Sequence, residues 1–274
     1  MRKILQYIGI VIIAVPQILY YHFHYICKMA KHPEKYDVNY RFSIVKKYFS
    51  KIINLFHIDI KHYNLEEYET YKGKKLIVSN HLSVLDPLVY CMLVSRPFAP
   101  VAKKEVLSYP FIGKVLKVLG GFSLDRKNVM NQIGEIRNIV NFLKSDVDCD
   151  VLIFAEGTRN KHPEKHCLDL HAGSFKIAQM AKVPICSIVT FGSYRVFETK
   201  HYVKPYPVWV QFGKLQSVEE ICSMPTQQLA DLYKKFIDDR VDEFRVLDKE
   251  YIYKLKISTK RKALETIADL PVKS

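Results

Sequence analysis

The chain has 274 residues, of which 49% are hydrophobic and 26% are charged. This length and composition are those of a globular protein, and they exclude a disordered chain, collagen and a small disulfide-stapled domain. The 42 Lys and Arg against 28 Asp and Glu leave a formal charge of +14, which favours an anionic partner such as nucleic acid, acidic lipid or a phosphorylated metabolite. The six cysteines form no CxxC pair, so free thiols in a reducing compartment are expected.

An apolar segment runs from Ile4 to Cys27 without a Lys, Arg, Asp or Glu. That length is enough for a helix to cross a hydrocarbon core of about 30 Å. Pro16 and His22 make the segment an uneven span, and cations flank both ends, so the positive-inside rule gives no orientation. We predict that the segment attaches the protein to a membrane, either as a span or as a kinked, half-inserted helix, with a buried soluble helix as the alternative.

A second helix is predicted over Arg41 to Phe56, where apolar residues recur at three- and four-residue steps and lysines occupy other positions. Such a basic amphipathic helix can lie in the headgroup layer of a membrane with its lysines near anionic lipid. It can equally pack on its own domain. The apolar segment before it favours the membrane.

After Tyr71 short apolar runs alternate with helical stretches, which is typical of an α/β fold with a central, mostly parallel or mixed sheet flanked by helices. The predicted strands are 75–79, 98–102, 121–124, 150–155, 184–191 and 208–212. The predicted helices are 86–94, 110–119, 129–143, 174–181 and 226–246. We therefore expect a membrane-associated helical segment over 1–58, one α/β domain over 59–250 and a basic tail over 251–274.

The chain lacks the GxGxxG and GxxxxGK motifs of dinucleotide and P-loop sites, and it has no RNP-like strand or zinc finger. Nucleic acid is therefore not expected as a partner, nor is a metal. A more informative cluster, Asn-His-Leu-Ser-Val-Leu-Asp, directly follows a predicted strand and ends at Asp86. Regular structure would separate His81 from Asp86, so they meet only if the chain turns between them. A carboxylate on one imidazole nitrogen prepares the other as a general base.

A second His and Asp pair at the same spacing, His32 and Asp37, follows no strand and stands in a Lys-Pro-Glu connection, so we assign it no chemistry. Three other polar groups follow predicted strands: Arg126, Glu156 and Arg159. Ligands bind at the carboxyl ends of the strands in open α/β sheets, so these groups are expected to share a crevice with His81. Two arginines there would suit a phosphate group.

These motifs resemble those of the lysophosphatidic acid acyltransferases and related glycerolipid acyltransferases, and they stand in the order of that family. The family's NHxSxxD block is Asn80 to Asp86, GxxFxxR corresponds to Gly120 to Arg126, FPEGTR to Phe154 to Arg159 and VPI to Val183 to Ile185. Two positions depart from the pattern. Ser123 replaces a phenylalanine and Ala155 a proline, which puts the acceptor substrate in doubt more than the reaction class.

The resemblance implies transfer of a fatty acyl group from a thioester to the free hydroxyl of lysophosphatidate, giving phosphatidate in phospholipid biosynthesis. His81 would take the hydroxyl proton and Asp86 would stabilise the imidazolium. The glycerol-phosphate part would be bound by Arg126, Glu156, Gly157, Thr158 and Arg159, with Lys103 as a further phosphate ligand. The enzyme would need no cofactor beyond its acyl donor, either acyl-CoA or an acidic acyl carrier protein.

The expected partners are thus the phospholipid bilayer, a lysophospholipid and the acyl thioester, and the expected place is a membrane, with the catalytic domain on its cytoplasmic face. Two alternatives stay open. The acceptor can be glycerol-3-phosphate or another lysophospholipid, or the chain can be a non-catalytic basic protein that binds acidic membranes. In the second case replacing His81 by alanine would leave function unchanged. A hydrolase is disfavoured because the chain contains no GxSxG elbow.

Overall fold

The structure, a computed structural model, describes residues 14–125, 129–198 and 205–259. Contacts divide the chain into two compact units. Unit 1 comprises Met1–His57 and Pro87–Leu152, and unit 2 comprises Ile58–Asp86 and Ile153–Ser274. The domain bounds expected at residues 58 and 250 stay predictions.

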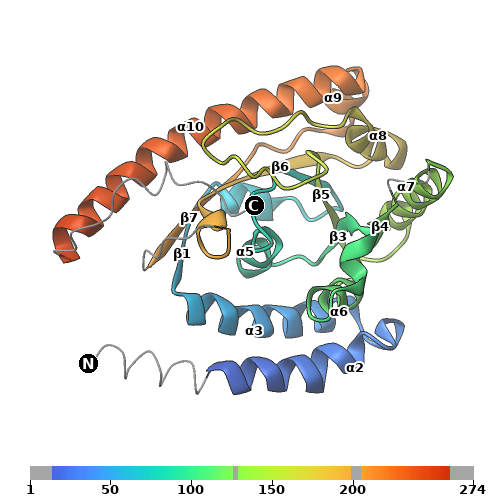
Figure 1. Cartoon of the computed structure of the whole chain (residues 1–274). Coiled ribbons are helices and arrows are strands. Elements are labelled where there is room, and N and C mark those ends of the chain that lie inside the picture. The colour runs from blue at the N-terminus through green and yellow to red at the C-terminus, as the bar shows by residue number, and fades with distance from the viewer. Residues whose placement is uncertain (1–13, 126–128, 199–204, 260–274) are drawn as a thin grey trace. The chain divides into compact units, whose positions relative to one another are not determined.

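The described part of unit 1 begins with helices and continues with parallel strands (Figure 1). Strand β3 pairs in parallel with both β4 and β5. The described N-terminal helices are residues 14–21, η1 (His22–Ile26, a π-helical turn), α2 (Cys27–Met29), η2 (Pro33–Lys35) and α3 (Val38–Phe56). The later elements are α5 (Asp86–Leu93), β3 (Phe98–Lys103), η3 (Lys104–Ser108), α6 (Ile112–Val118), β4 (Phe122–Leu124), α7 (Val129–Lys144) and β5 (Asp150–Phe154).

Unit 2 contains a mixed set of strands in the order β1-β7-β6-β2. The pairs β1 with β7 and β2 with β6 are parallel, whereas β6 and β7 are antiparallel. The long helix α10 packs against α8, β6 and β7 (Figure 1). The elements of unit 2 are β1 (Ile58–Tyr63), α4 (Leu65–Thr70), β2 (Leu76–Ser79), α8 (Ala172–Ala181), β6 (Ile185–Phe191), η4 (Ser193–Arg195), β7 (Tyr206–Phe212), α9 (Val218–Cys222) and α10 (Thr226–Thr259).

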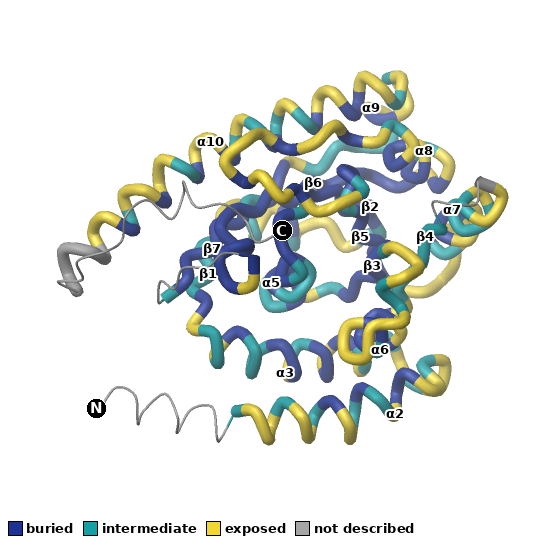
Figure 2. The backbone as a smooth tube through the Cα atoms, viewed as in Figure 1, coloured by how far each residue is buried: buried dark blue, intermediate teal, exposed yellow. Residues whose placement is uncertain are grey.

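Burial explains why the strands read as continuous apolar runs. Every residue of β2 and of β6 is buried, as expected for strands covered on both faces. Figure 2 shows these strands uniformly dark, whereas buried and exposed positions alternate along α10, which is amphipathic. Each strand and helix predicted after residue 71 has a counterpart, so the predicted α/β class with a mixed sheet is confirmed. The structure adds β1, α4 and α9, and it extends the last helix.

Helix α3 corrects one expectation. Its apolar residues do not face outward, because Phe42, Val45 and Phe49 are at most 4% exposed. The helix contacts α6, and the Phe42 ring packs against Phe98, both within unit 1. Two of its cations bind carbonyls at the ends of neighbouring helices: Arg41 Nη1 donates to Val118 O at 2.6 Å and Lys46 Nζ to Val94 O at 2.8 Å. Cations are favourable there because carbonyls are left unpaired at helix C-termini. The helix therefore packs on its own unit, and the headgroup-layer interpretation of this apolar face is wrong.

Much of the predicted membrane segment, residues 4–13, lies outside the described residues. From residue 14 onward, no described helix is both long and apolar enough to span a bilayer. The described part packs one side into unit 1, where His22, Ile26 and Met29 are at most 2% exposed. Residues 260–274 of the predicted basic tail also lie outside the described residues.

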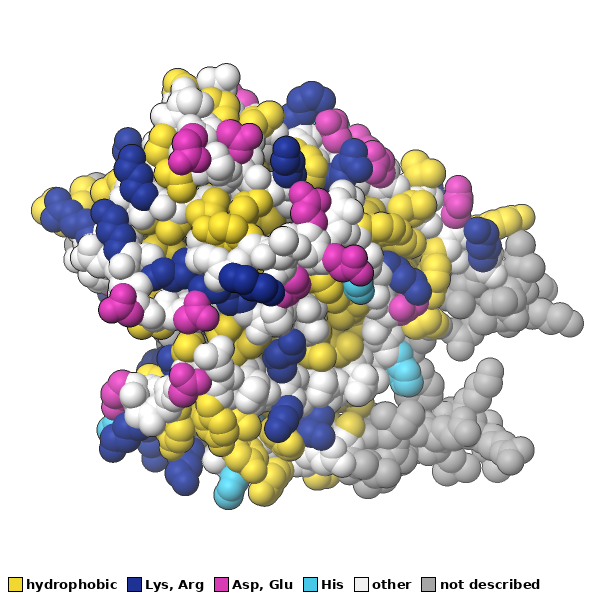
Figure 3. Space-filling model, turned by 180° about the vertical axis from the view of Figure 1, so that it is seen from behind, with side chains coloured by type: hydrophobic (Ala, Val, Ile, Leu, Met, Phe, Trp, Pro, Cys, Tyr) yellow, Lys and Arg dark blue, Asp and Glu magenta, His cyan; other side chains and the backbone are white. Residues whose placement is uncertain are grey.

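Charge on the surface is mixed. On the face shown in Figure 3, Lys and Arg side chains are interspersed with acidic and hydrophobic ones instead of forming one uniform basic patch. Several cations are paired locally, for example Lys235 with Asp239 at 2.9 Å and Arg240 with Glu243 at 2.6 Å. All six cysteines are free thiols.

Candidate active site

The turn between β2 and α5 is built around one carboxylate oxygen. Asp86 Oδ2 accepts from the backbone N–H groups of Leu82 at 2.8 Å and Ser83 at 2.9 Å, and it lies 2.9 Å from His81 Nδ1. The turn thereby brings together two residues that regular structure would separate. The Asp86 side chain has no exposed surface, and its Oδ1 is buried without a hydrogen-bond partner among the described residues.

The hydrogen bond to Asp86 determines which nitrogen of the His81 ring carries the proton. Because a carboxylate only accepts, Nδ1 carries the proton, and Nε2 of the neutral ring keeps its lone pair. Among the described residues none hydrogen-bonds Nε2, and 18% of the side chain is exposed. The arrangement presents a proton acceptor to solvent or ligand, with a buried negative charge behind it.

The last residue of β5 and the loop after it hold His81 from the other side. The Phe154 ring stacks on the imidazole, with ring centroids 4.0 Å apart and planes 20° apart. Glu156 Oε1 accepts from the His81 backbone N–H at 2.7 Å, and the backbone N–H of Asn160 donates to His81 O at 2.8 Å. The backbone and ring of His81 are therefore both fixed before any ligand binds.

Glu156 occupies a different environment from the one we expected of a substrate ligand. It is 3% exposed, and its second oxygen, Oε2, accepts from the Leu168 backbone N–H at 2.7 Å. Burial raises the pKa of Glu156 to about 7, although the hydrogen bonds from His81 and Leu168 oppose that rise. Burial therefore leaves Glu156 little surface that a substrate could contact.

The loop after Glu156 needs a glycine. Gly157 has φ 70°, in the left-handed region that side chains disfavour, and its N–H donates to Phe154 O at 2.9 Å. This hydrogen bond closes the turn without a proline, although the acyltransferases that the motifs resemble have proline at the position of Ala155. Thr158 and Arg159 follow on the surface, and the Arg159 side chain is 44% exposed.

Sequence reasoning missed Glu198, which follows η4. Glu198 is buried, and its carboxylate accepts from Ser83 Oγ at 2.9 Å and from Arg159 Nη1 at 3.1 Å. Burial, reinforced by the charge of Asp86, raises its pKa to about 7, while Ser83 and Arg159 oppose the rise. No local signal marks this residue, because it lies 115 positions from Ser83 and belongs to none of the motifs.

Asn80 is a second residue whose part only the fold reveals. Its side-chain amide pairs with the Thr190 backbone as a neighbouring strand would: Nδ2 donates to Thr190 O, and Oδ1 accepts from Thr190 N, both at 2.9 Å. This pairing extends the contact of β2 with β6 by one residue. The turn that carries His81 therefore starts from a fixed point.

Two predicted phosphate ligands are not placed with this cluster. Arg126 lies outside the described residues. Lys103 is the exposed last residue of β3 and belongs to unit 1, whereas His81, Asp86, Glu156, Gly157, Thr158 and Arg159 all belong to unit 2. Within the described ranges no group of three His, Cys, Asp or Glu side chains is arranged to hold a metal ion.

The pair His32 and Asp37 has local partners. His32 Nδ1 lies 3.2 Å from Glu34 Oε1 on the surface. Asp37 caps α3, since its Oδ1 accepts from the N–H groups of Asn39 at 2.8 Å and Tyr40 at 3.1 Å. Equal spacing without a strand end thus yields a helix cap at Asp37 and a surface contact at His32 instead of a second His–Asp pair.

Comparison with known proteins places these features in a family. Residues 59–190 match the protein family described as Acyltransferase. The 1-acyl-sn-glycerol-3-phosphate acyltransferase of Helicobacter pylori strain J99 is 31% identical over 169 residues, covering 60% of this chain and 68% of that protein. The enzymes of the same name from Escherichia coli K12 and Limnanthes douglasii are 29% and 25% identical, over 51% and 59% of this chain.

This chain spans about half the length of several of these relatives, 56% for both the Escherichia coli and the Limnanthes douglasii proteins. The crystal structure of the 1-acyl-sn-glycerophosphate acyltransferase PlsC from Thermotoga maritima superposes with a TM-score of 0.68, covering 89% of this chain and 98% of that one. At 20% sequence identity this likeness concerns the fold. Residues 59–190, which match the family model, contain the paired His81 and Asp86 and the loop of Glu156. Together with the 31% identity to the Helicobacter pylori enzyme, this match establishes that the chain belongs to the 1-acyl-sn-glycerol-3-phosphate acyltransferase family.

Proposed function

We propose that this protein transfers a fatty acyl group from an acyl thioester to the free hydroxyl of lysophosphatidate, giving phosphatidate. The observation that carries the proposal is the His81 imidazole, which has Nδ1 on a buried carboxylate and Nε2 without a partner among the described residues. Acyl transfer to an alcohol needs a base that removes the hydroxyl proton as the oxygen attacks. Family membership supports the reaction class.

In the proposed reaction Nε2 of His81 takes the proton of the acceptor hydroxyl, and that oxygen attacks the thioester carbonyl carbon. The C–S bond then breaks, and the leaving thiolate takes the proton back from Nε2, so His81 ends neutral. Asp86 stabilises the imidazolium between the two steps. Glu156 and Phe154 are positioning residues in this scheme, because they contact His81 and leave Nε2 open.

Arg159 is the proposed ligand of the acceptor phosphate within unit 2. Its side chain is 44% exposed, and a planar guanidinium binds phosphate through paired, charge-assisted hydrogen bonds. Gly157 and Thr158 stand beside it in the same loop. Lys103 and Arg126 stay proposed ligands on the strength of the family pattern.

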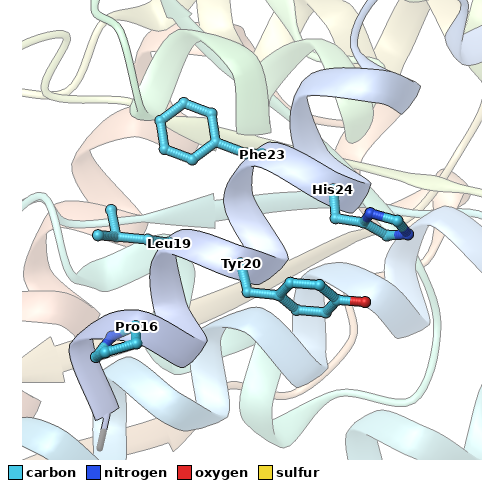
Figure 4. A pocket seen from close by; sticks show the side chains of 5 residues that line it. All are labelled: Pro16, Leu19, Tyr20, Phe23 and His24. Atoms are coloured by element: carbon cyan, nitrogen blue, oxygen red, sulfur yellow. The ribbon is translucent and has the colours of Figure 1, made fainter. Parts of the chain in front are cut away.

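We also propose that the N-terminal helix holds the protein at a membrane surface. Figure 4 shows five residues on one side of this helix, Pro16, Leu19, Tyr20, Phe23 and His24. Leu19, Tyr20 and Phe23 are 39%, 54% and 64% exposed, although they are large and apolar. Aromatic residues of this kind favour the boundary between lipid and water. Both proposed substrates partition into lipid, so such a site would meet them without extracting them into water.

Purified protein in detergent, supplied with lysophosphatidate and a labelled acyl thioester, tests the proposal. We expect labelled phosphatidate from the wild type and a loss of about 10² to 10⁴ in rate for His81→Ala. His162→Ala is the matched control, because this imidazole is 64% exposed and pairs with Glu164, so it should keep wild-type activity. Equal rates for His81→Ala and the wild type would overturn the proposed mechanism, and glycerol-3-phosphate in a parallel reaction tests the alternative acceptor.

A further inference from the structure

One buried carboxylate joins two loops of the candidate active site. Glu198 Oε2 accepts from Ser83 Oγ at 2.9 Å, and Glu198 Oε1 accepts from Arg159 Nη1 at 3.1 Å. The Val84 backbone N–H lies 3.4 Å from the same Oε1. Ser83 and Val84 belong to the turn that carries His81, whereas Arg159 belongs to the loop after β5. Glu198 therefore links the turn of the proposed base to the proposed phosphate ligand.

The two ends of this link differ in exposure. Glu198 is 8% exposed, whereas the Arg159 side chain is 44% exposed. Within the part of the chain that the structure describes, Glu198 is the acceptor of the single hydrogen bond that the Arg159 guanidinium makes. A guanidinium has five N–H donors, so the others stay available to a ligand. The buried carboxylate thus anchors one edge of the guanidinium and leaves the other edges outside.

Such an anchor matters because arginine is a long side chain with many rotamers. An unanchored arginine loses that freedom when it binds a ligand, and the loss weakens binding. An arginine already held by a buried carboxylate has lost part of that freedom in advance. The carboxylate also has an opposite effect, since its negative charge beside Arg159 lowers the attraction for an anion. These two effects predict opposite signs when the charge is removed.

We propose that Glu198 is a positioning residue that holds the Arg159 guanidinium at a set distance from His81, so that the site selects acceptors carrying a phosphate group. This inference rests on the proposed function, in which Arg159 binds that phosphate and His81 acts on the hydroxyl. Glu198 itself touches neither reacting group. It acts through Ser83 and Arg159.

A double-mutant cycle tests the inference with Glu198→Gln, Arg159→Ala and the double variant. Glutamine keeps the size of the side chain and one acceptor oxygen, but it removes the charge that anchors Arg159. For Glu198→Gln we expect the KM for lysophosphatidate to rise about tenfold while kcat changes less than about threefold. In the Arg159→Ala background the same substitution should have no further effect on KM.

Glu243→Gln is the matched control. Glu243 also pairs with an arginine, Arg240, but it does so on the surface of α10, where its side chain is 52% exposed. We expect wild-type KM and kcat for this variant. If Glu198→Gln does not fold, Glu198→Asp, which withdraws the carboxylate by one methylene, replaces it in the cycle with the same expected rise in KM.

Three results would overturn the inference: an unchanged or lower KM in Glu198→Gln, a fall in kcat with KM unchanged, or an equal rise in KM with and without Arg159. A parallel measurement separates this failure from that of the proposed function. Labelled lysophosphatidate is bound to each variant by equilibrium dialysis without an acyl donor. If Glu198→Gln weakens the binding of lysophosphatidate only when Arg159 is present, positioning is supported even if the wild type transfers no acyl group. If the wild type transfers the acyl group but the effects of the two substitutions are additive, the proposed function alone is supported.

Discussion

Asp86→Asn would separate the charge of the aspartate from its geometry. One oxygen, Oδ2, accepts three hydrogen bonds, from Leu82 N, Ser83 N and His81 Nδ1, while Oδ1 is buried and has no partner in the part of the chain that the structure describes. An asparagine amide can therefore place its oxygen at the Oδ2 position and its NH₂ group at the Oδ1 position. The backbone N–H groups of Leu82 and Ser83 require the amide oxygen at the Oδ2 position, because an NH₂ group at that position would face two donors. The histidine tautomer is preserved and the negative charge is lost.

The expected cost follows from the charge alone. Two unit charges about 4 Å apart interact by about 4 kcal/mol at an effective dielectric constant of about 20. If the proton is about half transferred in the transition state, about 2 kcal/mol of this stabilisation is realised there. At about 1.36 kcal/mol per factor of ten, Asp86→Asn should lower kcat roughly 30-fold. Its thermal midpoint should stay near that of the wild type.

Asp86→Ala provides the contrast. It leaves the buried N–H groups of Leu82 and Ser83 without their acceptor, at about 1–3 kcal/mol each, and it frees the ring of His81. We expect a lower thermal midpoint and a larger loss of kcat than in Asp86→Asn. Initial rates of phosphatidate formation and thermal unfolding of the three proteins measure both effects. Full activity in Asp86→Asn, or a loss equal to that of Asp86→Ala, would refute the reasoning.

Three further predictions concern stability and membrane binding. The pKa of Glu156 is about 7 in the fold against an ordinary 4.5, so protonation of Glu156 adds to the free energy of unfolding, and this added stability is lost as pH rises through 7. Between pH 6 and pH 8 the free energy of urea unfolding should therefore fall by about 1 kcal/mol less in Glu156→Gln than in the wild type. The same pH dependence in both proteins would contradict this. Gly157→Ala should lower that free energy by about 1 kcal/mol at its positive φ, whereas Gly173→Ala, with open space around it, should not. Phe23→Glu should reduce sedimentation with phospholipid vesicles, while Met130→Glu, at a 77% exposed position on α7, should not, and equal binding by both variants would count against the membrane surface.

Local sequence was enough to predict most of the secondary structure. The runs that became β2 and β6 are apolar and bounded by polar or turn residues, and their burial on both faces explains that pattern. β1 was missed because its sequence, IDIKHY, is half polar, and its strand character comes from parallel pairing with β7 far along the chain. The short helices α4 and α9 gave too few turns for a periodic signal.

The candidate site divides in the same way. The strand end before His81 and the helix start at Asp86 predict a turn, and the structure contains one with the two side chains 2.9 Å apart. The sequence did not indicate that Glu156 binds backbone N–H groups, because the same residue suits a buried acceptor and an exposed ligand. Glu198 carried no signal, since its partners Ser83 and Arg159 are distant in sequence.

The sequence by itself determined the α/β class, the order of the main elements and the turn that joins His81 to Asp86, because periodicity and turn chemistry act over a few neighbouring residues. Only the tertiary structure decided what covers an apolar face and what a buried charge binds. The apolar face of α3 would suit lipid or protein equally well, and packing within unit 1 decided between them. Hydrophobic attraction has no direction, so a pattern specifies that a face is buried without specifying its partner.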